Sequence, residues 1–588
     1  MFAFAGYAGG FYGTDINRVL NEISPYKDGK SYIFDGGCVL AQKQLSPRFD
    51  DGRTDYKSAD GLHIVFSGRI YNKNDIAPNA LQDAEAVLAG YKSLGKDVVK
   101  QLKGMFAFAI YDEAEQELFI ARDGSGMRSV YYTLTNGGIA FATNTRGFEH
   151  FCGFKKELNE DAVSPFLCFG SVPTSETLIK GVYRLEPGHF ISFKGGKFSK
   201  ECFFALEFRK DDKEIDEFIK DIHKTVEEAV NMHAIDNYGS FLSSGVDSSY
   251  IASVAKPKNT FTAGYSDSKY DESVYTKELA DILGIENHVR IINPEEYLAE
   301  YKNVVYFMDE PLSNPSVASI YFGAGAASEK VDAIISGEGA DELFGGYNSY
   351  KEELTHKKYM ALPYFIRHLA YILTAWIPSK KFDFFTRRGR KLRDYHIGLD
   401  RIFRDKDVKK LVNVKGGICT KDVVAEYYDR YESCTTMKQR QAIDYYFWLI
   451  NDFVHCVARS ADRWGIEARF PLLSKDVIDL AMGLPDEYKL KGGMTKHAFR
   501  MAAKNAIPND AYGRKKLGFP VPLRDWIKRD DYYTAIKEKF NGEVAKKFFK
   551  VKRINKLLDD HKNGKANNYK PVWTVYTFII WYEINFGG

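Results

Sequence analysis

The sequence predicts a chain of two parts: an α+β N-terminal domain of stacked antiparallel sheets, and an α/β C-terminal domain with a doubly wound parallel sheet and many helices. Three observations support this prediction. Short alternating strands broken by glycine fill the first part, strands and helices alternate from Asp216 onward, and 588 residues are too many for one hydrophobic core. We expect the boundary to divide residues 1–205 from residues 206–588.

The first part shows period-2 alternation in several short runs. Its opening residues alternate like a strand, and helical spacing appears at Ala84 to Ser93. The segment from Glu186 to Phe198 reads as a hairpin with Gly195-Gly196 at its turn, and the predicted boundary follows it. The other expected strands are Tyr32 to Leu40, Leu62 to Ile70, Met105 to Tyr111, Leu118 to Ala121 and Gly138 to Ala142.

The second part alternates helix and strand, which is typical of a doubly wound sheet with ligands at the carboxyl ends of its strands. Its expected elements are a helix from Asp216 to about Ala234, strand Gly239 to Leu242, a helix from Ser249, strand Thr260 to Gly264, helix Glu272 to Leu283 and strand His288 to Ile292. A long basic helical stretch follows, and we expect its densest charge run, Arg387 to Asp394, to be a solvated helix face. Aromatics from Trp573 to Trp581 predict a C-terminal core helix.

The composition limits which classes of partner we expect the chain to bind. The chain is 45% hydrophobic and 27% charged with a net charge of +3, so bulk charge indicates no nucleic-acid partner. Seven cysteines without a CxxC pair or a Cys/His cluster indicate a reduced, cytoplasmic setting. The apolar start lacks the basic region of a signal peptide, and Ile366 to Ile377 is too short to span a bilayer. We therefore expect no membrane partner.

The decapeptide FLSSGVDSSY, Phe241 to Tyr250, predicts a phosphate-binding loop. An apolar strand end runs through small residues into a helix, whose N-terminus favours an anion. Asp247 would repel a phosphate unless a divalent cation lies between them, which suggests Mg²⁺ on an ATP pyrophosphate. The alternative is a Ser/Gly turn with Asp247 as a helix N-cap.

A second loop, SGEGADELFGGY from Ser336 to Tyr347, follows the apolar strand Asp332 to Ile335. It places Glu338, Asp341 and Glu342 among four glycines. Carboxylates this close repel one another unless a cation or a proton-transfer role offsets the cost. A solvated acidic turn, the alternative, would not explain the glycines.

These two loops carry a family resemblance. FLSSGVDSS resembles the pyrophosphate loop SGGxDSS of the N-type ATP pyrophosphatases, with Ser244 in place of the first glycine, and SGEGADELFGGY resembles a loop of the asparagine synthetase family. The resemblance implies ATP and Mg²⁺ as cofactors, Asp247 and Asp341 as metal ligands, and Glu338 as an acid/base. The nucleotide-binding residues it implies are Ser243, Gly245, Asp247, Ser248, Ser249, Gly264 and Gly337.

Further segments match the same family in order. Lys496 in GGMTKHAFR falls on the family's phosphate-binding lysine, and Asn314 in DEPLSNPSVAS replaces a usual Asp. Taken alone, Lys496 would read as an exposed helix lysine. The other matching segments are FTAGYSDSKYDES (Phe261 to Ser273), WGIEARFPLLS (Trp464 to Ser474) and RKKLGFPVPLRDW (Arg514 to Trp526).

The first part resembles the glutaminase domain of class II glutamine amidotransferases, an Ntn-hydrolase-like fold, through LKGMFAFAIYD, RDGSGMRSVYY and SGRIYN. That chemistry needs an N-terminal cysteine nucleophile, and this sequence has Phe2 there. Gln44 replaces the arginine that holds the glutamine carboxylate, and NGE becomes Ser67-Gly68-Arg69, while Asp83 keeps an acidic position. We expect an inactive relic. The rival interpretation is that Arg69 has remade the pocket for another ligand.

Together the motifs predict an ATP-dependent amide ligase. A small-molecule carboxylate attacks the α-phosphorus to give an acyl-adenylate and pyrophosphate, and free ammonia or an amine then expels AMP. Glu338 is the expected base and Lys496 the expected oxyanion partner. Two alternatives stay open: a specialised ligase resembling β-lactam synthetases or lasso-peptide cyclases, the former disfavoured by Glu338, and a non-catalytic scaffold. Homodimer formation is also left open.

Overall fold

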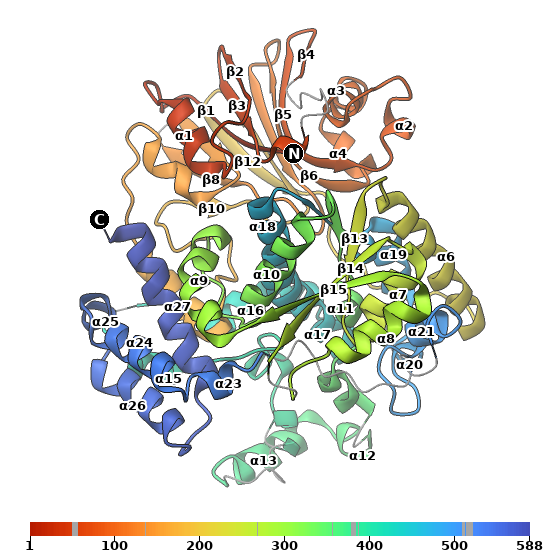
Figure 1. The fold of residues 1–588 in the computed structure, drawn as a ribbon, viewed down its shortest axis with the longest axis vertical. Helices are drawn as coiled ribbons and strands as arrows, with labels where there is room; N and C mark the ends of the chain where they lie inside the picture. The colour runs from red at the N-terminus through yellow and green to blue at the C-terminus, as the bar shows by residue number, and fades with distance from the viewer. Residues whose placement is uncertain are drawn as a thin grey trace.

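The computed structural model describes residues 1–49, 57–135, 137–266, 269–354, 357–377, 384–385, 387–414, 416–508, 512 and 521–587. Within these residues the chain forms three sheets, two antiparallel in the N-terminal part and one parallel in the C-terminal part (Figure 1). The predicted fold class is confirmed. The segments 267–268 and 513–520, which belong to two of the matching motifs, lie outside the described residues.

The two N-terminal sheets have six strands each, in the orders β10-β8-β9-β1-β3-β2 and β12-β11-β7-β6-β5-β4, and all neighbouring strands are antiparallel. Their inner faces share a buried apolar cluster. The strands are β1 (Phe2–Ala8), β2 (Ser31–Asp35), β3 (Val39–Gln44), β4 (Lys57–Ala59), β5 (Leu62–Ile70), β6 (Gly104–Asp112), β7 (Glu117–Arg122), β8 (Tyr131–Thr135), β9 (Gly138–Ala142), β10 (Tyr183–Arg184), β11 (His189–Lys194) and β12 (Lys197–Cys202). The helices of this part are α1 (Ile16–Ile23), α2 (Lys73–Ile76), α3 (Asp83–Leu94), α4 (Val98–Gln101) and α5 (Glu160–Phe169).

One strand prediction is wrong. The run from Tyr32 to Leu40 is two antiparallel strands, β2 and β3, joined by a reversal at Gly36-Gly37. A Cβ on Gly37 would lie 2.1 Å from the Tyr111 hydroxyl oxygen, so glycine is required where the chain turns. The hairpin of β11 and β12 is confirmed, with φ of +56° and +75° at Gly195 and Gly196, as a two-residue turn of this type demands.

The C-terminal sheet is parallel, with strand order β15-β14-β13-β16-β17, as a doubly wound sheet requires. The order reverses between β13 and β16, so a crevice opens at the carboxyl ends of these two neighbours. Helices α7 and α8 cover one face, and α10 and α18 cover the other (Figure 1). The strands are β13 (Tyr238–Phe241), β14 (Asn259–Tyr265), β15 (Glu286–Ile292), β16 (Ala333–Ile335) and β17 (Glu467–Arg469).

Many helices surround this sheet. Those near the sheet are α6 (Ile215–His233), α7 (Val246–Ala255), α8 (Ser273–Leu283), α9 (Pro294–Met308), α10 (Ser316–Ser328), α11 (Ala340–Phe344), α18 (His455–Trp464), α19 (Lys475–Gly483), α20 (Asp486–Lys489) and α21 (His497–Ala503). The others are α12 (Lys357–Met360), α13 (Tyr364–Thr374), α15 (Asp405–Leu411), α16 (Thr420–Arg430), α17 (Thr436–Asp444), α23 (Leu523–Trp526), α24 (Asp530–Asn541), α25 (Glu543–Phe548), α26 (Val551–Lys562) and α27 (Tyr569–Phe586). The segment Tyr445–Val454, labelled η6, is a π-helix.

Three helix predictions can be compared with the structure. Trp573 and Trp581 are buried in α27, as expected of a C-terminal core helix. Helix α7 begins at Val246, three residues before the expected start at Ser249. The solvated face expected at Arg387 to Asp394 is wrong in part, because Arg388 is 2% exposed and lies 3.4 Å from a carboxylate oxygen of Glu352.

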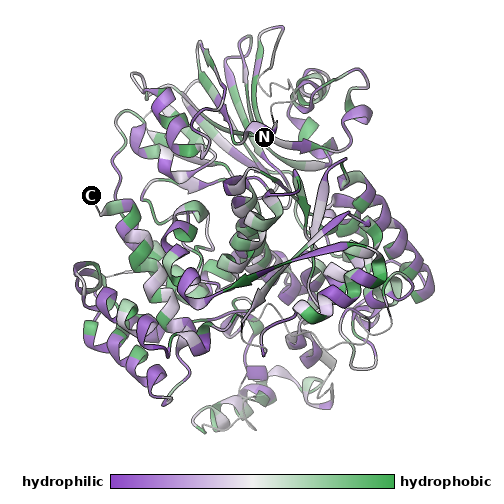
Figure 2. Cartoon of the chain, in the orientation of Figure 1, coloured by the Kyte–Doolittle hydropathy of each residue, from purple (hydrophilic) through white to green (hydrophobic). Residues whose placement is uncertain are grey.

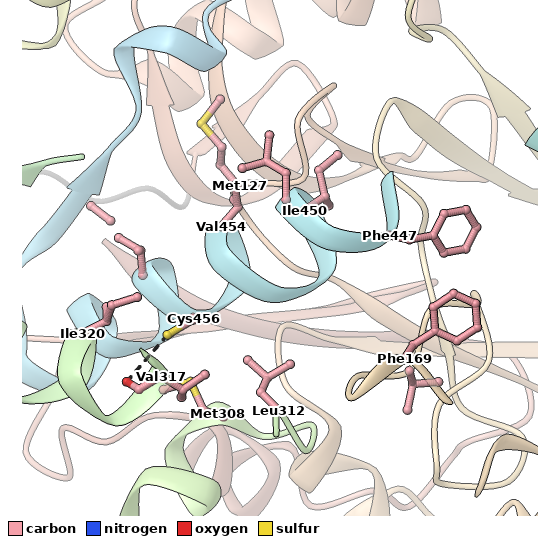
Figure 3. Close-up of a cluster of buried hydrophobic side chains, with 14 of the residues drawn as sticks. Met127, Phe169, Met308, Leu312, Val317, Ile320, Phe447, Ile450, Val454 and Cys456 are labelled. Atoms are coloured by element: carbon pink, nitrogen blue, oxygen red, sulfur yellow. Dashed lines mark hydrogen bonds between the residues drawn. The ribbon is translucent and has the colours of Figure 1, made fainter. Parts of the chain in front are cut away.

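The two parts of the chain share a hydrophobic core. Figure 3 shows Met127 and Phe169 of the N-terminal part against Phe447 and Ile450 of the π-helix, and the Phe169 and Phe447 rings stack with centroids 5.7 Å apart. On the other side of this layer, Cys456 donates to the Val317 carbonyl oxygen of α10. The π-helix is therefore packed between the N-terminal part and the helices that flank the parallel sheet.

The predicted division into residues 1–205 and 206–588 stays a prediction. The last N-terminal strand, β12, ends at Cys202, and α6 begins at Ile215. Across this junction the buried Arg128 guanidinium forms two hydrogen bonds with Asp462, at 3.0 and 3.1 Å. Among the residues that the structure describes, no helix is long and apolar enough to cross a bilayer.

His233 makes the stability of this junction dependent on pH. Its ring is fully buried at the end of α6, 4.1 Å from the Tyr71 ring, and Nδ1 donates to the Ala229 carbonyl oxygen. Burial lowers the pKa of His233 from 6.5 to about 3, an effect that nearby Arg469 reinforces. In the unfolded chain His233 is therefore protonated below about pH 6.5, whereas in the folded chain it stays neutral. The free energy of unfolding consequently decreases as pH falls below 6.5.

We expect this loss to reach about 2 kcal/mol between pH 7 and pH 5. His233→Asn keeps a donor near Nδ1 but cannot titrate, so it should remove that part of the pH dependence. Urea unfolding of both proteins at the two pH values measures the difference, and His223→Asn, an exposed position on the same helix, is the control. Equal pH slopes for wild type and His233→Asn would contradict the assignment.

Candidate active site

A pocket lies at the carboxyl ends of β13 and β16, where the strand order reverses. It encloses about 240 Å³. Part of its wall comes from the loop after β13, the loop after β16, and helix α10 through Ser319, Ile320 and Gly323. The two strongest sequence motifs thus meet in one cavity, at the place where doubly wound folds bind ligands.

The loop after β13 is held by its own hydroxyl groups. Ser243 N–H donates to Ser248 Oγ at 3.0 Å, and Gly245 N–H donates to Ser243 Oγ at 3.2 Å. Gly245 is the N-cap of α7, which puts Asp247 in the first helical turn and not at the N-cap. Ser243, Gly245, Asp247 and Ser248 line the cavity, whereas Ser249 is buried behind it and donates to the Gly245 carbonyl oxygen at 2.7 Å.

Ser244, the residue that departs from the SGGxDSS pattern, fits the loop without strain. It is absent from the residues with positive φ, so the backbone freedom of glycine is not needed there. Its N–H donates to Glu272 Oε2 at 3.0 Å, which fixes the loop to the start of α8. Its side chain is buried.

The loop after β16 is buried, so it is not a solvated acidic turn. Asp341 and Glu342 are both buried in α11, and Glu338 lines the cavity half-buried. Burial and the neighbouring Asp341 charge raise the pKa of Glu342 to about 8. A Cβ on Gly337 would lie 3.2 Å from the Ser248 nitrogen, so glycine lets the two loops touch.

Lys496 joins the two loops. Its Nζ lies 2.7 and 2.6 Å from the two carboxylate oxygens of Asp247 and 2.7 Å from Asp341 Oδ1, and its side chain is 1% exposed. The residue is the N-cap of α21 with φ +53° and ψ +37°, a left-handed conformation that a lysine adopts at an energetic cost. Sequence reasoning expected a phosphate- or oxyanion-binding lysine, and the structure places its ammonium between the two predicted metal ligands.

The donor set suits Mg²⁺ bound together with phosphate. Because one ammonium group reaches both Asp247 and Asp341, their oxygens lie close enough for one cation. Among the described residues no three His, Cys, Asp or Glu side chains form a metal cluster. Two carboxylates are what Mg²⁺ uses when substrate phosphates and water complete its octahedron, so the residues fit the ion.

Gly264, predicted to bind nucleotide, is not part of the cavity wall. Its neighbour Ala263 lines the cavity, while a Cβ on Gly264 would meet Ile291 Cδ1 at 2.8 Å. Glycine at this position allows close packing against Ile291 of β15.

Several pocket residues carried no sequence signal. Trp448, Phe453, Val457 and Leu399 form an apolar wall, and the first two come from the π-helix η6. In sequence these aromatics look like core residues of an ordinary helix. A π-helix is uncommon and is found often at functional sites, but its wider turn cannot be read from the side-chain pattern.

Asn314 contacts the same π-helix at Asp452, the residue before Phe453. Its Nδ2 donates to Asp452 Oδ1 at 2.9 Å, and its Oδ1 accepts from the Ser316 N–H at 3.0 Å. Burial raises the pKa of Asp452 to about 7. The asparagine therefore links the start of α10 to the π-helix that forms the apolar wall.

In the N-terminal part, the positions that correspond to a glutaminase site are occupied by structural contacts. Phe2 is 1% exposed, and Gln44 Oε1 accepts from the Lys30 N–H. Arg69 Nε lies 2.9 Å from Glu467 Oε2, and its NH1 lies 3.6 Å from Asp83. These contacts favour a structural role for Arg69 over the alternative of a remade ligand pocket.

The contact between Arg69 and Glu467 is an ion pair, because Glu467 is ionised. Burial alone would raise its pKa, but Arg469 and Arg69 outweigh that effect and hold the pKa at about 2. Arg469 NH2 lies 2.6 Å from the second carboxylate oxygen. A strand of the parallel sheet, β17, is thereby tied to the N-terminal part by a buried ion network.

Comparison with known proteins agrees with both halves of this description. The asparagine synthase family model matches residues 221–583, and the glutamine amidotransferase domain model matches residues 16–204. The chain is 32% identical to asparagine synthetase (glutamine-hydrolyzing) 1 of Bacillus subtilis, over 97% of this chain and 93% of that protein. It is 28% identical to a putative asparagine synthetase of Mycobacterium bovis, over 90% and 85% of the two chains. It is 23% identical to the amidase chry2 of Gibberella zeae, over 79% and 78%.

Gly346 tests whether the Lys496 contact organises the pocket. A Cβ at this position would lie 1.7 Å from Asp341 Oδ1 and 2.6 Å from Lys496 Cε, so Gly346→Ala must displace the ion pair. We expect at least a roughly tenfold loss of ATP-dependent pyrophosphate release. Gly542→Ala is the matched control, because Gly542, like Gly346, is absent from the glycines with positive φ and the nearest atom lies 3.3 Å from its added Cβ. Full activity in Gly346→Ala would contradict the interpretation.

Proposed function

The chain belongs to the asparagine synthase family, and we propose that it joins a small-molecule carboxylate to free ammonia or an amine. Membership of this family makes it an ATP-dependent ligase. The observation that carries the proposal is the Lys496 ammonium held between Asp247 and Asp341, beside a loop built to bind phosphate at the switch point of the sheet. A scaffold protein would have no need of this strained, buried charge cluster.

In the first step, the loop after β13 holds the ATP phosphates. The backbone at Gly245 and the hydroxyls of Ser243 and Ser248 lie at the N-terminus of α7, where the helix dipole favours an anion. Asp247 and Asp341 would hold Mg²⁺, which neutralises phosphate charge when bound. The substrate carboxylate then attacks the α-phosphorus, and an acyl-adenylate and pyrophosphate form.

In the second step, a nitrogen nucleophile attacks the acyl carbon and expels AMP. Glu338, which lines the cavity, is proposed to take the proton that the nitrogen loses. Lys496 is proposed to stabilise negative charge that develops at the phosphates or at the tetrahedral oxygen. Asp247 and Asp341 both offset the positive charge of Lys496. If either carboxylate binds another cation instead, the electrostatic potential of Lys496 at the cavity becomes more positive.

The nitrogen source is proposed to be ammonia or an amine from solution. Arg69 is engaged by Glu467 and Asp83, and Phe2 is buried where the family's chemistry needs a thiol. The Bacillus subtilis relative, by contrast, is named as a glutamine-hydrolyzing enzyme. All seven cysteines are free thiols, which supports the proposed reduced, cytoplasmic setting.

A second candidate substrate class follows from the apolar wall. Trp448, Phe453, Val457 and Leu399 offer no charged group to a polar amino acid. A carboxylate attached to an apolar group would bury that group against this wall, as in a specialised amide ligase. Aspartate and apolar carboxylates are therefore both included in the assay.

Pyrophosphate release measures adenylation directly. We expect release with ATP, Mg²⁺, ammonium chloride and at least one acid of a panel that includes aspartate and aromatic and aliphatic carboxylates. Lys496→Met and Glu338→Gln should each lower the rate roughly 100-fold, while Lys504→Met, an exposed lysine beyond α21, should not. Absence of release with every acid would refute the ligase proposal.

The nitrogen source is tested separately. With the best carboxylate, ammonium chloride should support amide formation and glutamine should not, because buried Phe2 stands where glutamine hydrolysis needs a thiol. Glutamate is measured as the product of glutamine hydrolysis. Its formation above the level of an enzyme-free reaction would overturn the proposed nitrogen source but leave the ligase proposal intact.

A further inference from the structure

Helix α13 carries an unusual number of exposed apolar side chains. Phe365 is 72% exposed, Leu369 56%, Ile372 55%, Leu373 60% and Trp376, just beyond the helix, 78%. We call these five residues the α13 face. No residue of the helix is buried, and Figures 1 and 2 show it at the lower end of the molecule, away from the three sheets and coloured largely as hydrophobic.

The five residues lie on one side of the helix. Their spacings of four, seven, eight and eleven residues from Phe365 fall within one stripe of a 3.6-residue period. The opposite side faces the protein and is polar: Arg367 NH1 donates to the Arg388 carbonyl oxygen at 2.9 Å, and His368 Nδ1 lies 3.0 Å from the Gly389 carbonyl oxygen. A helix of a water-soluble domain normally has the reverse orientation, with its apolar stripe facing the core.

Close packing holds the helix in this orientation. A Cβ on Gly389 would lie 2.3 Å from the Arg367 carbonyl oxygen and 2.5 Å from Tyr371 Cβ. The backbone of the following segment therefore contacts the polar side of α13 directly. Rotating the helix to bury its apolar stripe would break this contact and both hydrogen bonds.

The sequence that flanks α13 is rich in positive charge, although Arg388 is buried against Glu352. Between residues 357 and 393 the sequence has ten Lys and Arg and one Asp or Glu, a net charge of +9, although the whole chain carries only +3. The remaining residues together are therefore net negative. Arg390 and Lys391, among the described residues, lie directly after the segment that contacts α13.

We propose that the α13 face docks on an anionic lipid surface, with the helix lying in the plane of the interface. An exposed apolar stripe with Phe and Trp, flanked by many cations, is the combination that binds such a surface: the apolar side chains enter the acyl boundary and the cations meet anionic headgroups. A second copy of the chain is a poorer occupant, because it would bring two segments of net +9 together. An uncharged partner would form no favourable electrostatic interaction with this positively charged segment.

The chain segment that carries α13 is connected at both ends to the candidate active site. The segment that carries α13 begins just after Tyr347 and ends just before Leu399, and both of these residues line the pocket. The proposal itself rests on the exposed stripe and the charge, so it stands or falls independently of the ligase activity.

Vesicle co-sedimentation tests the proposal with the full chain. We expect binding to phosphatidylcholine vesicles that contain about 30% phosphatidylserine at about 0.1 M salt, and at least roughly tenfold weaker binding to pure phosphatidylcholine. The double variant Leu369→Glu/Trp376→Glu should lose binding to the anionic vesicles by a similar factor. The matched control, Leu81→Glu/Val274→Glu, places the same charges at two other exposed apolar positions, 82% and 70% exposed, and should bind like wild type.

Several results would overturn the proposal. They are absence of binding to the anionic vesicles, equal binding by the α13 double variant, and equal binding to neutral vesicles. A dimer in size-exclusion chromatography that the α13 double variant abolishes would assign the face to a second copy instead. Because α13 buries none of its side chains, the double variant should keep the wild-type melting temperature, which shows that any loss of binding is local.

Discussion

The ammonium of Lys496 is the contact on which the candidate site depends. It bonds carboxylates from two loops that follow different strands of the parallel sheet, Asp247 after β13 and Asp341 after β16. Two buried carboxylates without a cation would repel each other, so the lysine allows the loops to approach. This arrangement requires a left-handed backbone conformation at Lys496 and a residue without a side chain at Gly346. The loops are thus positioned by charge as well as by the strands that carry them.

The N-terminal part supports this site from outside. Its ion network with Glu467 fixes β17, the outermost strand beside β16, and its apolar residues pack on the π-helix that carries Trp448. A domain that we propose to be inactive toward glutamine can therefore still be required for the shape of the pocket. The partly buried Arg69 explains such a requirement, since it joins Asp83 of the N-terminal part to Glu467 of β17, which Arg469 also contacts.

Sequence alone predicted the parts of the molecule that depend on local pattern. The parallel strands, the Gly195-Gly196 hairpin and the meeting of the two loops follow from periodicity, turn chemistry and the rule for doubly wound sheets. What it missed depends on contacts between distant residues. At the reversal, Gly37 lies against Tyr111 of another strand, and Gly264 packs against Ile291 of β15. The wall at Trp448 belongs to a π-helical turn.

Helix α13 shows the same limit in another form. The segment from Ile366 to Ile377 is too short to span a bilayer, and this length argument excludes a crossing but not a helix that lies on the surface. An apolar stripe at helical spacing predicts an amphipathic helix, yet the spacing is identical whether the stripe faces the core or the solvent. Only the contacts of Arg367 and His368 with the chain behind them show that the polar side faces inward. The direction of the stripe, and with it the surface it offers, is therefore a property of the tertiary structure.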